Sequence, residues 1–181
     1  MSAVTEQQIP AGTWTLDPIH SSASFAVKHM VVSTFRGRFE DFDAKLDVAE
    51  DGSATLTGTV DADSIVVKDP NLAGHLQAPD FFDVERHPEL RFEAHDLRRD
   101  GDDIVVNGEL TIKGHTNPLE ARGTIAGPHQ NIRDMTTLGL TFETVIDRTK
   151  YGLEWNAPLP KGGFALSNEV TLLVELELSK A

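Results

Sequence analysis

From about residue 13 onward, apolar and polar residues alternate with a period of two, as they do in strands that bury one face and expose the other. The alternation predicts eight strands, at 23–29, 42–48, 54–62, 90–94, 104–112, 119–125, 138–146 and 170–178, with 13–17 as a possible ninth. Turn-forming Gly, Asp and Pro residues separate these stretches, so consecutive strands should pair antiparallel. Such strands must close into a barrel or pack as two sheets.

Small residues are frequent on the predicted inward face of these strands. They are Ala23, Ala44, Ala54, Gly58, Ala62, Ala94, Gly108, Ala121 and Gly123. A solid interior at a packing density of about 0.74 would need mostly Leu, Ile, Val and Phe. We therefore predict an all-β, extended antiparallel barrel of about eight strands around a long, narrow, apolar pore. One alternative stays open, in which the glycines relieve bending at barrel corners and the alanines face Phe partners.

Two stretches depart from the strand pattern, and together they predict one or two short helices that cap an end of the barrel. Asp69 followed by Pro70 is typical of a helix N-terminus, and the link around it is too long for a hairpin. Residues 30–35 are expected to form a single helical turn that ends before Gly37. Phe39 and Phe42 are apolar at opposite parity, which predicts a β-bulge near residues 40–41.

The length of 181 residues suits a single domain. We expect that domain to span residues 13–181, after a flexible tail over residues 1–12. No apolar run exceeds three residues, which leaves no candidate membrane span and no apolar core of a signal peptide. The expectation is a soluble, cytoplasmic protein without stable membrane insertion.

The chain is acidic and contains no cysteine. It has 16 Lys and Arg residues against 29 Asp and Glu residues, a formal net charge of −13. An acidic surface argues against nucleic-acid partners, because that binding rests on basic side chains that neutralise phosphates. The absence of cysteine excludes disulfides, thiolate nucleophiles and metal sites with cysteine ligands.

The sequence offers no motif of a catalytic or cofactor site. The seven histidines have no close ligand spacing, so no metal is predicted. The chain lacks a G-x-S-x-G elbow, a P-loop and a G-x-G-x-x-G motif, so no catalytic residue and no cofactor is predicted. His29 continues the inward parity of its strand. An enzyme that acts on an apolar substrate, with His29 and either Asp17 or Glu143 in proton transfer, remains a minor alternative.

Several segments, in order along the chain, carry a resemblance to a known family. They are Trp14-Thr-Leu-Asp17-Pro18-Ile-His20-Ser21, Phe25-Ala-Val27-Lys28-His29, Gly37-Arg-Phe39, Asp63-Ser64-Ile65, His75-Leu76, Asp80-Phe81-Phe82-Asp83, His87-Pro88, Gly108-Glu-Leu110-Thr111, Gly114-His-Thr116 and Arg148-Thr-Lys-Tyr151-Gly152-Leu153. Together they resemble the YceI-like polyisoprenoid-binding family over about residues 14–178. The combination is specific, although each segment alone is a weak signal.

The resemblance implies a lipocalin-like barrel that holds a long-chain isoprenoid lipid, such as a polyprenyl quinone, and that is often a homodimer. Many family members are exported, whereas this chain shows no export signal. The implied function is non-enzymatic binding, storage or transport of that lipid. The alternative is a structural or regulatory barrel with a filled core.

Candidate ligand-binding residues follow from inward parity and from the pore that the resemblance implies. They are Phe25, Val27, His29, Phe42, Leu56, Gly58, His75, Phe81, Phe82, Phe92, Val106, Gly108, Leu110, Phe142, Arg148 and Leu172. His29, His75 and Arg148 are the candidates for contact with a lipid head group. Phe81 and Phe82 could form a hydrophobic lid or plug the open end as ordinary core. A Gly108→Phe substitution is expected to fill the pore of a folded protein.

Overall fold

The computed structural model describes residues 8–181, and within them strands dominate. The strands are β1 (Gly12–Leu16), β2 (Ser22–His29), β3 (Ser33–Phe39), β4 (Phe42–Val48), β5 (Ala54–Asp61), β6 (Ile65–Val66), β7 (Glu89–Asp100), β8 (Asp103–Ile112), β9 (His115–Gln130), β10 (Thr136–Asp147) and β11 (Leu166–Lys180). The helix α1 spans Pro70–Gln77, and the short 3₁₀ turns η1 and η2 span Ala62–Ser64 and Arg148–Tyr151. No helix in this part of the chain is long and apolar enough to cross a membrane.

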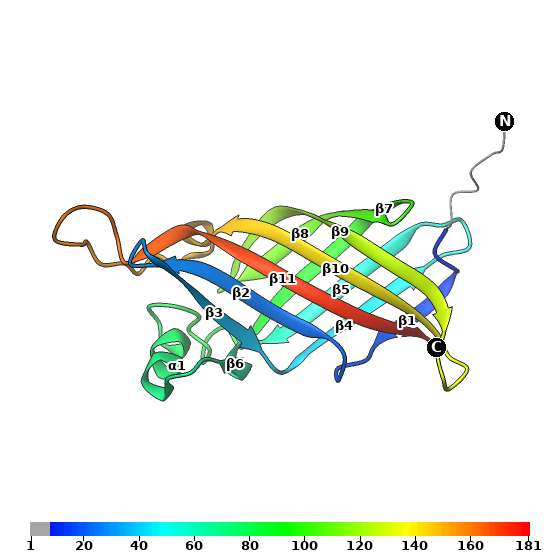
Figure 1. Cartoon of the computed structure of the whole chain (residues 1–181), viewed down its shortest axis with the longest axis horizontal. Helices are drawn as coiled ribbons and strands as arrows, with labels where there is room; N and C mark the ends of the chain where they lie inside the picture. Colours follow the sequence, from blue (N-terminus) through cyan, green and yellow to red (C-terminus); the bar gives the residue numbers. More distant parts are fainter. Residues whose placement is uncertain (1–7) are drawn as a thin grey trace.

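Eight strands close into an antiparallel barrel, which confirms the predicted fold class. Their order is β1-β4-β5-β7-β8-β9-β10-β11, and β1 also pairs with β11. The barrel is elongated, with the C-terminus at one end and α1 near the other (Figure 1). Because consecutive strands joined by short turns pair antiparallel, the order around the barrel largely follows the order along the chain.

The long strand β11 has different partners at its two ends. Its last residues pair with β1, where Leu178 faces Leu16. Its first residues pair with β2, in a register that places Leu166 opposite His29 and Glu175 opposite Ser22. Strand β2 continues the sheet to β3 and β6. The wall at this second end is therefore completed by β2, β3, β6 and the α1 segment, whose Leu76 packs in one cluster with Phe39.

The observed burial follows the predicted alternation. In β10, Leu138, Leu140, Phe142 and Ile146 are buried, whereas Glu143 and Val145 are exposed. The predicted N-cap of α1 is also confirmed, because the Asp69 carboxylate accepts a hydrogen bond of 2.9 Å from the backbone N–H of Leu72.

Two local predictions were wrong. Residues 30–35 do not form a helical turn. Met30 and Val31 adopt positive φ angles of 51° and 68° in a tight turn, and the chain returns as β3. A β-bulge is also not found at residues 40–41, where β3 ends and β4 begins. There Glu40 donates to the Ser64 carbonyl and the Asp41 carbonyl accepts from Asp61, so the backbone bends where it changes partners.

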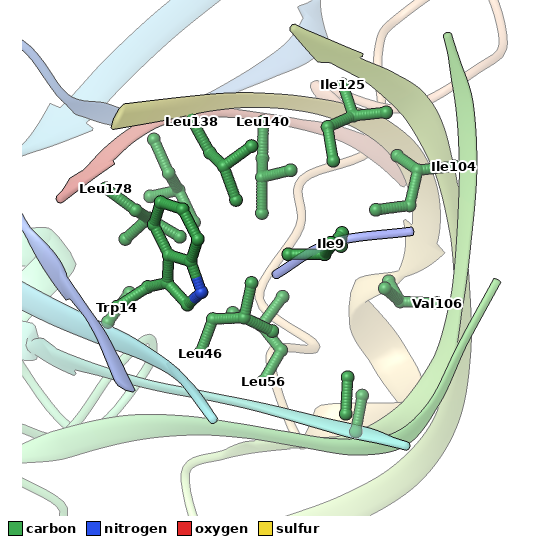
Figure 2. Packing of buried hydrophobic residues seen from close by; sticks show 14 of the residues in the cluster. Ile9, Trp14, Leu46, Leu56, Ile104, Val106, Ile125, Leu138, Leu140 and Leu178 are labelled. Carbon is green, nitrogen blue, oxygen red and sulfur yellow. The ribbon is translucent and has the colours of Figure 1, made fainter. Parts of the chain in front are cut away.

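A dense apolar core fills the end of the barrel where β1 pairs with β11. Side chains from facing strands meet there, as Figure 2 shows for Trp14, Leu46, Ile104 and Leu178. Ile9 is also buried in this core, and the indole N–H of Trp14 donates to the Pro10 carbonyl at 3.1 Å. The expected tail over residues 1–12 is therefore packed from Ile9 onward, while residues 1–7 lie outside the described part of the chain.

The parity of β11 makes a direct prediction about stability. Leu178 is fully buried in the core, whereas Leu173 on the same strand is 36% exposed. We expect Leu178→Ala to lower the free energy of unfolding by about 3–5 kcal/mol, because it leaves a cavity in a packed core. Leu173→Ala should cost less than about 1 kcal/mol. Urea unfolding of both variants checks the difference, and equal losses would contradict the inward assignment of Leu178.

Candidate ligand-binding cavity

The other half of the barrel is hollow and contains two apolar cavities. The outer cavity, near α1, has a volume of about 460 Å³, and the inner cavity, deeper in the barrel, has a volume of about 170 Å³. Both are bounded by five shared residues: Phe25, Phe39, Leu90, Ile112 and Leu172. The two cavities therefore adjoin each other at these residues. Ligand sites typically measure about 300–1,000 Å³, and apolar cavities near 150 Å³ stay dry and accept small apolar molecules.

The inner cavity ends against the dense core. Leu56, Val106, Ala121, Phe142 and Leu176 line the inner cavity and also belong to the core cluster that contains Trp14. The hollow therefore has a floor and does not run through the whole barrel. A long apolar guest would enter from the α1 end and stop at this floor.

Small inward residues play two different roles. Ala23, Ala44, Gly58 and Ala121 line the inner cavity, as the pore prediction requires. Gly123 instead permits a close approach of strands, because a Cβ atom there would lie 1.7 Å from the carbonyl oxygen of Thr141. Four small residues therefore agree with the pore prediction, whereas Gly123 admits the backbone of the neighbouring strand, a role that neither interpretation gave it.

Aromatic side chains enclose the outer cavity below α1. The His75 ring meets the rings of Phe81 and Trp155 edge to face, at centroid distances of 5.0 and 5.2 Å. Phe82 meets Phe39 in the same manner at 5.7 Å. These contacts join α1 and the segment after it to the loop between η2 and β11, so residues distant in sequence form one side of the cavity.

Fifteen of the sixteen candidate ligand-binding residues line these cavities. The inner cavity has Phe42, Leu56, Gly58, Phe92, Val106, Leu110 and Phe142, the outer has Val27, His29, His75, Phe81, Phe82 and Arg148, and Phe25 and Leu172 line both. Their contact with a ligand stays a prediction.

Gly108 lies in neither wall, although it has inward parity. A Cβ atom there would sit 2.2 Å from the carbonyl oxygen of Glu93 and 2.7 Å from the Cα atom of Ala94. The pairing of β7 with β8 shifts register just beyond, between Ala94 and Asp96. Gly108 therefore serves the close approach of two strands. The expectation that Gly108→Phe would fill the pore of a folded protein was wrong.

The groups of the minor enzyme alternative do not meet. His29 lies at the rim of the outer cavity and is exposed, and Glu143 is exposed on the outer face of β10. Asp17 hydrogen-bonds through its backbone to Glu177, whereas His29 faces Leu166 at the other end of β11. At about 3.3 Å per residue, these two positions on β11 lie roughly 35 Å apart.

Sequence reasoning missed a part of the outer cavity. Met30, Leu153, Trp155 and Ala165 line it from the β2–β3 turn and from the loop before β11. That loop has no alternation and no motif that would direct its side chains inward. Its place depends on tertiary contacts, among them the hydrogen bonds of Arg148 described next and the contact of Trp155 with His75.

Arg148 is the most buried cationic residue of the outer cavity, with 3% of its surface exposed. It begins η2, which Asp147 caps and which ends at Gly152 with a φ of 72°. Its Nε donates to the Ser167 carbonyl at 2.9 Å, and its Nη1 donates to the carbonyls of Leu153 and, at 2.9 Å, Trp155. Burial lowers the pKa of Arg148, and the neighbouring Asp147 carboxylate acts in the opposite direction.

A second polar cluster lies far from the cavities, at the β1–β2 turn. The Nδ1 of His20 is 2.8 Å from the Asp17 carboxylate, and these side chains and Glu177 present ligand atoms within 4.8 Å of one another. The hydrogen bond to His20 lowers the pKa of Asp17, and the hydrogen bond and charge of Asp17 raise the pKa of His20. Asp17 also accepts from the Ile19 backbone, so the cluster fixes the turn.

Comparison with known proteins agrees with this architecture. The model of the YceI-like domain family matches residues 14–178. A UPF0312 protein of Staphylococcus aureus is 31% identical over 169 residues, covering 92% of this chain and 96% of the relative. A UPF0312 protein of Staphylococcus epidermidis is also 31% identical, over 172 residues with the same coverage.

Solved structures share the fold. BcnA of Burkholderia cenocepacia superimposes with a TM-score of 0.76 at 21% identity, over 90% of this chain and 98% of BcnA. The YCEI protein of Campylobacter jejuni gives 0.70 at 23% identity, over 85% and 90% of the two chains. A polyisoprenoid binding domain from Saccharophagus degradans gives 0.67 at 14% identity, over 93% and 98%.

The two inward glycines should respond differently to the same substitution. Gly108→Ala should lower the free energy of unfolding by about 1–3 kcal/mol, because the new methyl group meets strand backbone. Gly58→Ala should change it by less than about 1 kcal/mol, because the nearest atom, the Asp43 carbonyl oxygen, lies 3.6 Å from the Cβ position. Thermal unfolding monitored by circular dichroism checks both, and an equal response would contradict the assignment of Gly108.

The Asp17–His20 pair predicts a pH-dependent contribution to stability. The pKa of His20 is raised, so its contribution is complete below the ordinary value of 6.5 and disappears as pH rises through the folded pKa. The pKa of Asp17 is lowered, so its contribution is complete above 3.8 and disappears as pH falls through the folded pKa. Asp17→Asn should therefore destabilise most near pH 5 and least near pH 8. Proton NMR should show the His20 pKa falling in this variant, and an unchanged pKa would refute the pairing.

Proposed function

The chain belongs to the YceI-like family, and on this premise we propose that its barrel binds a long-chain isoprenoid lipid and stores or transports it without chemical change. The observation that carries the proposal is the hollow half of the barrel, with its outer and inner cavities enclosed by aromatic and aliphatic side chains. The fold shared with a polyisoprenoid binding domain supports the ligand class. The alternative function, a structural or regulatory barrel, requires a filled core, and the barrel has such a core only in the half around Trp14.

The shape of the hollow suits a chain more than a compact ligand. Its walls extend from Leu166 to Leu176 along β11, which is about 33 Å of strand at ~3.3 Å per residue. With a strand tilt of about 40°, this gives roughly 25 Å along the barrel axis. An extended chain that occupies both cavities would pass Phe25 and Phe39, which border both.

The energetics favour exchange and storage over extraction. Burial of hydrocarbon gains about 0.8 kcal/mol per CH₂, or roughly 4 kcal/mol for a five-carbon isoprene unit, before ordering costs. A lipid bilayer offers the same gain, so transfer between bilayer and barrel is nearly neutral. The affinity of the protein for the lipid, relative to the bilayer, would then depend on the cost of ordering the chain and on contacts with the head group.

Two measurements test the proposal: the lipid that co-purifies with the protein, and the binding of an added polyprenol. Protein purified without detergent should release an isoprenoid lipid into organic solvent for mass spectrometry, or should bind an added polyprenol probe at a one-to-one ratio. Native mass spectrometry of the intact protein measures the complex directly. Protein that is empty in every preparation and binds no polyprenol would overturn the proposal.

The floor of the inner cavity should limit the length of the bound chain. Gly58→Leu places a branched side chain in the inner cavity, so affinity for a polyprenol of about eight isoprene units should fall at least tenfold, while a chain of two units still binds in the outer cavity. The matched control is Gly74→Leu on α1, where a Cβ atom would meet nothing within 4 Å. Competition against a fluorescent lipid measures both. Equal affinity of Gly58→Leu and the unchanged protein for the long chain would contradict this depth.

A further inference from the structure

Arg148 has hydrogen-bonding capacity that the protein itself does not use. Its Nε and Nη1 are occupied by three backbone carbonyls, from Ser167, Leu153 and Trp155. Its Nη2 is buried and has no hydrogen-bond partner among residues 8–181. Arg148 lines the outer cavity, and Nη2 is the part of its guanidinium that no described protein group satisfies.

We propose that the ligand is an anionic amphiphile whose head group, a carboxylate or a phosphate, accepts hydrogen bonds from Nη2 of Arg148 in the outer cavity. This inference rests on the proposed function and names the chemistry of the head group. The apolar tail then extends past Phe25 and Leu172, which border both cavities, into the inner cavity. The ligand has one orientation, with its charge toward the α1 end.

The charges around the outer cavity favour an anion. The titratable side chains that line it are Arg148, His29 and His75, and none of the described residues in its wall is acidic. This is notable in a chain with a net charge of −13. His75 has Asp80 at 3.6 Å, but Asp80 is exposed and lies outside the lining.

Arg148 also has no ion-pair partner among the described residues, although the charge of Asp147 acts on it. No carboxylate of residues 8–181 forms an ion pair with it. The neighbouring Asp147 carboxylate is engaged by the backbone N–H and the hydroxyl of Thr149 at 3.0 and 2.6 Å. A buried charge without a counterion is costly, and three carbonyls offset only part of that cost. A carboxylate or phosphate matches the planar donors of Arg and would supply the missing charge.

A purely structural role for Arg148, as the anchor of the loop before β11, is the rival explanation. It predicts no preference among ligands that share one tail. The decisive experiment therefore varies the ligand and leaves the protein intact. Farnesol, farnesoic acid and farnesyl phosphate have the same fifteen-carbon tail and differ in the head group. Isothermal titration calorimetry at low salt and again at about 0.5 M NaCl, where exposed charges are screened, measures their affinities.

We expect at least one of the two anions to bind tenfold or more tightly than farnesol, and to keep most of that preference at high salt because the site is buried. The order of the two anions then identifies the head-group class. Equal affinities, or tighter binding of farnesol, would overturn the anionic head group and leave the isoprenoid-binding proposal standing. Failure of all three to bind would overturn both.

A variant pair then assigns the preference to Arg148. Arg148→Gln should bring the ratio of the affinities for the preferred anion and for farnesol close to one. The ratio is the readout, because the substitution also removes hydrogen bonds that hold the loop at the cavity wall and can change the affinity for both ligands. Arg99→Gln is the matched control, because Arg99 also donates to carbonyls, of Gly101 and Gly127, and has a buried nitrogen without a partner, yet it lines neither main cavity. It should keep the preference.

A second measurement covers the case in which Arg148→Gln does not fold. In the intact protein labelled with ¹⁵N-arginine, the side-chain NMR signals of Arg148 should shift on addition of the anion and stay unchanged with farnesol. Signals that respond equally to both ligands would overturn the direct contact.

Discussion

The divided pairing of β11 is the constraint on which the rest of this structure depends. One edge of β11 pairs with β10 from Glu169 to Ser179, whereas the other edge changes partner. That second edge pairs with β1 near Leu178 and with β2 toward Leu166. Where β1 pairs, eight strands close tightly and their side chains fill the barrel. Where β2 pairs, the wall needs β3, β6 and α1 to complete it. The tight end is solid and the wide end is hollow for this reason.

The shape of the hollow end also depends on Arg148 and the loop to which it is hydrogen-bonded. The loop between η2 and β11 has no strand partner along most of its length, and Arg148 fastens it through the carbonyls of Leu153, Trp155 and Ser167. Through Trp155 the loop reaches His75 and hence α1. A single buried cation thus shapes one side of the outer cavity and places a positive charge at that end of the hollow. An otherwise apolar space acquires a head end and a tail end.

The residue alternation was sufficient to predict the barrel and to name strand residues of which nearly all line the cavities, because side-chain direction in a strand has a period of two. Its failures are specific. Gly108 has the correct parity, but the facing strand backbone occupies the space that its side chain would need. Residues 30–35 interrupt the alternation, which led to the predicted helical turn, yet a tight turn at Met30 and Val31 and the pairing of β3 with β2 decide their conformation.

By itself, then, the sequence determined which face of each strand is buried, where α1 begins and which family the chain resembles, since these depend on residues close together along the chain. The tertiary structure alone decided where the hollow stops, because its floor is built from Leu56, Phe142 and Leu176 on three different strands. It alone decided that Arg148 is buried and that its Nη2 has no partner among the described residues, because the loop after η2 folds back and brings Ser167, 19 residues further along the chain, to Arg148.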